Sequence, residues 1–141
     1  METQRSRPVL CPSAQPGIAG GVAFGVVGGT LDQPRVAWLE RPMPLTDDLL
    51  ALTAPVHPTE VLRIAAPCQE ACCHFDGKDC RLAARLVQIL PPVSGALPPC
   101  QIRVDCRWFL QEGRVACQRC PQVVTCVLNP SEELSRAATP A

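Results

Sequence analysis

The sequence predicts a small, loop-rich α+β fold, in which an N-terminal β-hairpin or small sheet is followed by short helices gathered around cysteine-ligated metal sites. Three observations lead to this prediction. Two β-prone runs flank a segment rich in turn formers near the N-terminus. Apolar residues recur at helical spacing in the second half of the chain. Ten of the 141 residues are cysteines, and eight of these lie between Cys68 and Cys120.

The predicted hairpin joins residues 22–27 (VAFGVV) to residues 35–40 (RVAWLE) through the turn-forming segment GGTLDQP. Residues 1–16 are polar and rich in proline, which predicts an irregular arm. Residues 129–141 predict a disordered tail. A single cysteine-rich domain is therefore expected over residues 17–128.

Helices are expected at three places after the hairpin. Thr46 is a suitable N-cap for a helix that begins with two aspartates. Residues 59–65 (TEVLRIA) predict a strand or a short helix. The clearest helix spans residues 80–90, where apolar side chains form one stripe and Asp79 is the expected N-cap.

Composition limits the function classes. The chain carries 13 basic and 13 acidic side chains, and this zero net charge argues against a nucleic-acid or acidic-membrane binder. The apolar run over residues 17–31 is too short and too rich in glycine for a bilayer span or a secretory signal. We therefore expect a cytoplasmic protein, in which clustered cysteines are metal ligands rather than disulfides.

The spacing of the cysteines selects seven candidate metal ligands: Cys68, Cys72, Cys80, Cys100, Cys106, Cys117 and Cys120. The C-x2-C pair at the end of this series is the strongest signal, because a turn of that length directs two sulfurs at one metal. Cys73 is adjacent to Cys72, so the two side chains point apart and only one of them is expected to bind. Cys11 and Cys126 have no partner at ligand spacing and are expected to be buried thiols.

A second helical stretch is expected over residues 105–119, with Asp105 as a possible cap. It contains two of the candidate ligands, and a straight helix would hold them too far apart to share one site. In one unbroken helix, Cys106 and Cys117 would lie ~16 Å apart, too far for one site. Either they serve different sites, or Gly113 breaks the helix and folds Cys117 back.

The cofactor prediction is an iron–sulfur cluster, with [4Fe–4S] favoured and one or two clusters possible. Thiolate suits both iron–sulfur clusters and zinc. Structural zinc sites usually show two short cysteine or histidine pairs, and this sequence has one. The C-x2-C-x2-C-x3-C-P run of bacterial ferredoxins is also missing. Zinc remains the alternative metal.

The residues around the cysteines carry charge and bulk. Residues 68–120 hold seven basic and five acidic side chains. This excess of two would either offset an anionic cluster or form a solvated arginine face. Trp108 and Phe109 are expected to pack around the site and keep it dry. His74 beside Cys73 is either a nitrogen ligand or an ordinary turn residue.

Three long segments, HFDGKDCRLA, LPPCQIRVDCRWFLQEG and ACQRCPQVVT, together with the upstream FGVVGGT and PRVAWLE, resemble a family of small bacterial cysteine-rich proteins. The resemblance covers most of the chain. It implies a metal or iron–sulfur site shared across the group and names no activity.

The function predicted from the sequence is cluster binding, in electron transfer or as an accessory to a partner protein or redox enzyme. The alternative is a zinc-stapled structural or adaptor protein without redox activity. An enzyme is less favoured, because no Ser/His/Asp set and no paired carboxylates are recognisable.

Overall fold

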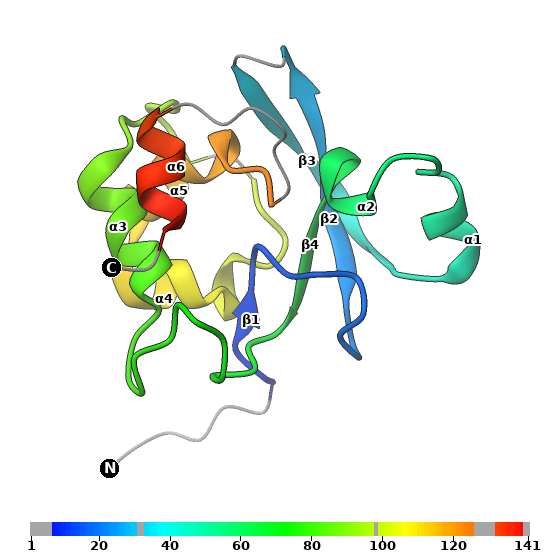
Figure 1. Cartoon of the computed structure of the whole chain (residues 1–141), viewed down its shortest axis with the longest axis horizontal. Helices are drawn as coiled ribbons and strands as arrows, with labels where there is room; N and C mark the ends of the chain where they lie inside the picture. The colour runs from blue at the N-terminus through cyan, green and yellow to red at the C-terminus, as the bar shows by residue number, and fades with distance from the viewer. Residues whose placement is uncertain (1–6, 31–32, 98, 126–131, 140–141) are drawn as a thin grey trace.

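The fold is α+β, built from a four-stranded antiparallel sheet and several short helices (Figure 1). It is seen in a computed structural model that describes residues 7–30, 33–97, 99–125 and 132–139. The strands are β1 Leu10–Cys11, β2 Val22–Gly29, β3 Pro34–Pro44 and β4 Leu62–Pro67, in the sheet order β1-β4-β2-β3. The predicted fold class is confirmed in this respect. The expected metal site is not part of what the structure shows.

The predicted hairpin is confirmed as β2 and β3, and both strands are longer than their most β-prone cores. Strand β2 also pairs with β4, and both of its ladders shift register between Ala23 and Gly25. This bulge lies at Phe24. Gly25 is needed there, because a Cβ at this position would lie 2.6 Å from Val36 Cγ1 and 2.8 Å from Trp38 Cε3.

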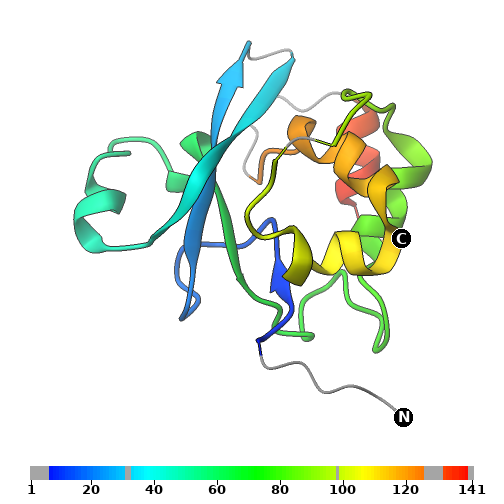
Figure 2. The ribbon, with the colours of Figure 1, turned by 180° about the vertical axis from the view of Figure 1, so that it is seen from behind.

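Both faces of the sheet are covered, as its alternating side chains require. Phe24 and Ala65 face the cysteine-rich helices and belong to the larger core. Ala23, Ile64 and their neighbours face the segment of helices α1 Asp47–Ala51 and α2 Pro58–Val61 and form a smaller core. Figure 2 shows the two helical groups on opposite sides of the strands.

The helical elements on the cysteine-rich side are α3 Arg81–Ile89, η1 Arg103–Asp105, α4 Arg107–Glu112, α5 Arg114–Arg119, η2 Cys120–Gln122 and α6 Glu132–Ala138. Thr46 caps α1 as predicted, because its hydroxyl accepts from the Leu49 N–H at 3.1 Å. The predicted caps Asp79 and Asp105 are corrected. The N-cap positions of α3 and α4 are Cys80 and Cys106, neither of which makes a side-chain cap hydrogen bond.

Other segments also differ from expectation. Residues 59–65 contain both of the alternatives, since α2 runs directly into β4. The arm predicted over residues 1–16 contains β1, because its backbone finds hydrogen-bond partners on β4. The tail predicted over residues 129–141 contains α6, which packs on α3 and buries Ala137. In the described part of the chain, no helix combines the length and apolarity needed to cross a membrane.

Candidate functional site

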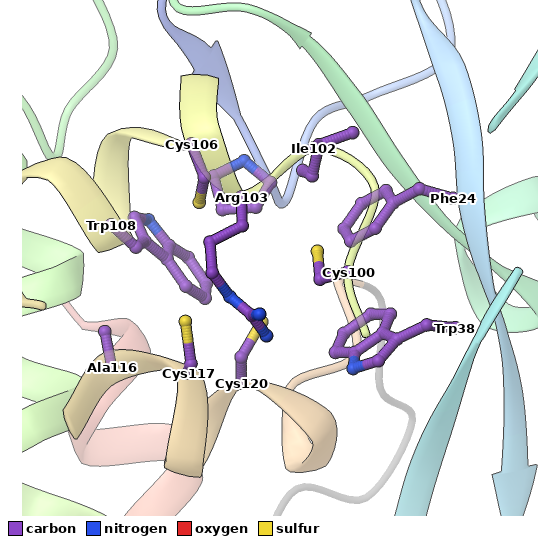
Figure 3. Close-up of a pocket in the computed structure, with 11 residues that line it drawn as sticks. Phe24, Trp38, Cys100, Ile102, Arg103, Cys106, Trp108, Ala116, Cys117 and Cys120 are labelled. Carbon is purple, nitrogen blue, oxygen red and sulfur yellow. The ribbon is translucent and has the colours of Figure 1, made fainter. Parts of the chain in front are cut away.

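Four cysteines line one pocket between the sheet and the helices (Figure 3). We call them the first thiol group: Cys100, Cys106, Cys117 and Cys120. Cys100 lies in the loop before η1, Cys106 caps α4, Cys117 lies on α5, and Cys120 begins η2. All four were predicted ligands, and the fold brings them to one place.

Gly113 explains how Cys106 and Cys117 reach the same pocket. Its backbone has φ 76° and ψ −155°, a conformation that is essentially restricted to glycine. The chain therefore breaks between α4 and α5, as one of the two sequence alternatives required. The distance of ~16 Å expected for an unbroken helix no longer applies.

The walls of the pocket are aromatic. Phe24 and Trp38 from the sheet stack with ring centroids 5.1 Å apart and an interplanar angle of 8°. Trp108 from α4 closes another side and is 1% exposed. The cavity between the side chains measures about 20 Å³, which is room for about one water molecule. Trp108 was predicted to pack here. Phe109 packs against the core cluster that includes Cys106 and Cys120, and the Arg103 guanidinium lies 6.0 Å from its ring centroid.

A buried arginine supports the pocket from the sheet side. Arg63 on β4 is 0% exposed, and its Nη2 donates to Cys120 Sγ at 3.0 Å. Its other N–H groups donate to the carbonyl oxygens of Pro12, Cys120 and Val123 at 2.8–2.9 Å. All five guanidinium donors are thus satisfied, and only the sulfur among their acceptors can become anionic.

The same guanidinium is also held by aromatic rings. Its Cζ lies 5.4 Å from the Phe24 centroid and 5.5 Å from those of Trp38 and Trp108. No ion pair among the described residues involves Arg63. A buried permanent charge is costly unless an opposite charge is near. The first thiol group therefore adjoins a cation that favours negative charge at its sulfurs.

Burial controls the protonation of these thiols. It raises the pKa of Cys106 to about 12, with the nearby thiols of Cys120 and Cys100 adding to the effect. Burial also raises the pKa of Cys100 and of Cys117. Arg103 acts in the opposite direction, because its side chain hydrogen-bonds to Cys117 and its charge is near both thiols. Figure 3 shows Arg103 reaching in among the sulfurs from η1.

The remaining predicted ligands form a separate cluster. Cys68, Cys72 and Cys80 lie near Cys11, and we call these four the second thiol group. Cys11 was expected to be a buried thiol without ligand partners, because no cysteine lies at ligand spacing from it. The pairing of β1 with β4 brings Cys11 near cysteines that are distant in sequence. Cys126 lies outside the described residues.

Cys73 and His74 line a different groove, together with Arg81 and Arg85. Arg85 Nη2 lies 2.7 Å from His74 Nδ1, and since a guanidinium only donates, the imidazole accepts there. Burial, with the charge of Arg85 adding to it, lowers the pKa of His74. The turn-residue interpretation therefore fits His74 better than a role as ligand.

Three important residues were not singled out from the sequence: Arg63, Phe24 and Trp38. Arg63 had a signal, because it interrupts the apolar run VLRIAA, and a charge within a buried strand requires a specific partner. Phe24 and Trp38 gave no such signal in the sequence, beyond their position in β-prone runs.

As the side chains lie, no three histidine, cysteine, aspartate or glutamate residues in the described part of the chain are arranged to hold a single metal ion. The described cysteines are all free thiols. The four sulfurs of the first thiol group surround a pocket that also holds the Arg103 side chain. Compared with known proteins, the chain matches no family model, no curated protein and no solved structure.

Proposed function

We propose that the protein is an iron–sulfur protein whose first thiol group binds a cluster, with [4Fe–4S] favoured. The carrying observation is that four cysteines from the 100–120 segment line one aromatic-walled pocket, where a buried arginine donates to one of their sulfurs. Four thiolates are the ligand set of such clusters, and hydrogen bonds to sulfur tune their potential. The bound cluster would supply one-electron redox chemistry.

The surroundings fit an anionic, multi-iron group. Arg63 and Arg103 place two positive charges at the thiols. Zinc, the alternative metal, needs its sulfurs about 3.8 Å apart, from a metal–sulfur distance of ~2.3 Å in a tetrahedron. As they lie, the four sulfurs of the first thiol group are not arranged to hold one such ion. A cluster with several irons is held by sulfurs that are spread more widely than those of a zinc site. Because the cavity measures about 20 Å³, loading requires Arg103 to swing out from among the sulfurs.

The exposure of the four thiols supports the proposal of an electron-transfer role, to or from a partner protein. Cys106 and Cys120 are buried, whereas Cys100 and Cys117 are half-buried. One side of the pocket is therefore dry, and the other approaches the surface. Electron exchange with a redox partner needs an approachable edge, and cluster stability needs the dry side.

The test is anaerobic purification, followed by a visible spectrum and analysis of iron, acid-labile sulfide and zinc. We expect a brown protein, and the Cys106→Ser variant should lose about four irons per chain. The control is Cys73→Ser, which removes an exposed thiol outside both groups and should lose none. A colourless protein with stoichiometric zinc would sink the proposal. A cluster that cannot be reversibly reduced would overturn the electron-transfer role.

A further inference from the structure

The second thiol group begins with a strand pairing. Strand β1 runs antiparallel to β4, with Leu10 opposite Pro67 and Cys11 opposite Ala66. The Cys68 N–H then donates to the Val9 carbonyl at 2.8 Å, which continues the ladder by one more bond. Residues from distant parts of the sequence, Cys11 and Cys68, are thereby held at the same end of the sheet.

The loop after Cys68 brings two more thiols, those of Cys72 and Cys80, to the end of the sheet that holds Cys11 and Cys68. The Phe75 N–H donates to the Cys72 carbonyl at 3.1 Å, and Phe75 then pairs with Cys80 in an antiparallel bridge. Gln111 of α4 fixes the backbone of Cys80 from both sides. Its Oε1 accepts from the Cys80 N–H and its Nε2 donates to the Cys80 carbonyl, each at 2.8 Å.

Cys11 lies within range of the charge of the other three thiols. Burial raises the pKa of Cys11 to about 11, and the thiols of Cys80, Cys68 and Cys72 raise it further. Burial also raises the pKa of Cys80, with the thiol of Cys72 adding to it. Cys73 lines the groove beside His74 instead, although it is the neighbour of Cys72 in sequence.

This group has its own cation, as the first one does. The Arg107 side chain hydrogen-bonds to Cys68 and pairs with Glu70 at 2.6 Å. Its guanidinium lies 5.2 Å from the Phe75 ring centroid, so an aromatic wall is present as well. The two thiol groups thus share a pattern of four sulfurs, a guanidinium donor and an aromatic ring.

Helix α4 contacts both thiol groups. Its cap, Cys106, belongs to the first group and pairs with Leu10, the neighbour of Cys11, in a parallel bridge. The Trp108 side chain lines the first pocket and also hydrogen-bonds to Cys80. Because the indole N–H only donates, Cys80 Sγ is the acceptor. Trp108 is therefore a direct bridge between the groups.

We propose that Cys11, Cys68, Cys72 and Cys80 form a second four-thiolate iron–sulfur site, joined to the first through Trp108, so that the chain carries two clusters side by side. The proposal rests on the proposed function, since it extends cluster binding from one thiol group to two. It adds Cys11 as the fourth ligand, which no spacing in the sequence indicates.

The experiment is anaerobic reconstitution of the full chain with ferrous iron and sulfide, followed by iron and sulfide analysis. Wild type should hold about eight irons, and Cys11→Ser about four. The matched control Cys73→Ser should hold about eight. Cys72→Ser repeats the test at an exposed position, so a folding defect at Cys11 does not decide the result. Circular dichroism confirms that each variant is folded.

The outcomes separate the two proposals. If wild type and the Cys11→Ser and Cys72→Ser variants all hold about four irons, while Cys106→Ser holds none, the second site is overturned and the first stands. If Cys106→Ser keeps all the iron of wild type, the proposed function of the first group fails. In reduced wild type, electron paramagnetic resonance should show two interacting spins. Loss of that interaction in Cys11→Ser supports the pair, and its absence in wild type overturns the side-by-side arrangement.

Discussion

Arg63 Nη2 donates to Cys120 Sγ at 3.0 Å, and this contact joins the centre of the sheet to the cysteine-rich helices. The guanidinium is fully buried and also binds three backbone carbonyls on two other segments. It therefore connects β4, the segment after β1, and η2 in one polar network inside an apolar core.

The first prediction concerns this network. Arg63→Lys keeps the charge but offers three donors where five are used, so at least two of the five hydrogen bonds are lost. Each buried acceptor left unsatisfied costs roughly 1–3 kcal/mol, so we expect a loss of about 2–4 kcal/mol of unfolding free energy in urea titrations. The control is Arg35→Lys, an exposed residue with one bond to its neighbour's carbonyl. Equal stability of the two variants would contradict the structural role of Arg63.

The second prediction concerns the bulge in β2. Gly25→Ala places a methyl group 2.6 Å from Val36 Cγ1 and 2.8 Å from Trp38 Cε3, so the indole must move. Overpacking of this kind costs about 1–3 kcal/mol and should change the near-UV circular dichroism of the tryptophans. Gly28→Ala in the same strand is the control, because its nearest neighbour is the Arg35 carbonyl at 3.4 Å. An unchanged spectrum in Gly25→Ala would refute the close packing of Trp38.

The third prediction concerns the break between α4 and α5. A Cβ at Gly113 meets nothing within 4 Å, so Gly113→Ala tests the backbone alone. We expect a loss of roughly 1–3 kcal/mol of unfolding free energy and reduced iron loading, because Cys117 is displaced from Cys106. Gly95→Ala, which is also open to solvent and has no positive φ, should change neither. Full iron loading in Gly113→Ala would show that the break is not needed to assemble the first thiol group.

The fourth prediction concerns pH in buffer without iron or zinc, under reducing conditions. Burial raises the pKa of Cys106 from 9.0 to about 12, so between these values the native state keeps a proton that the unfolded chain has lost. The contribution of Cys106 to the unfolding free energy should therefore be constant below about pH 9. Above that pH it should fall, by at most about 1.4 kcal/mol per pH unit. Cys106→Ala should have a shallower slope between pH 9 and 10.5. Parallel slopes for the two proteins would disprove the shift.

Local patterns predicted much of this molecule. The hairpin, the Thr46 cap and the stripe of α3 each depend on neighbouring residues, and all three are confirmed. The Gly113 break was one of two alternatives, and spacing alone could not choose between them. The predicted caps failed for two different reasons: the Asp105 carboxylate pairs with Arg7, and Asp79 lies one residue before the N-cap position of α3. Asp105 is buried and pairs with Arg7 at 3.2 Å, and the turn before α3 is closed by the Asp76 carboxylate.

The division of the cysteines into two groups is visible in part from the sequence, because a gap separates the candidate ligands of residues 68–80 from those of residues 100–120. Sequence spacing can only assign residues that are close along the chain to one site. It correctly predicted that Cys117 and Cys120 lie together. It had no means to place Cys11, whose partners are reached only through the pairing of β1 with β4. Arg63 was missed for a related reason, since its acceptors come from two segments that are both distant from it in sequence.

The short strand β1 has a consequence for the order of assembly. The first thiol group is drawn from residues 100–120, so it closes a short loop and can form early in folding. The second group extends from Cys11 to Cys80 and waits for a long-range strand pairing of two residues. When the full-length chain folds, the thiols around Cys106 should therefore be gathered before those around Cys11.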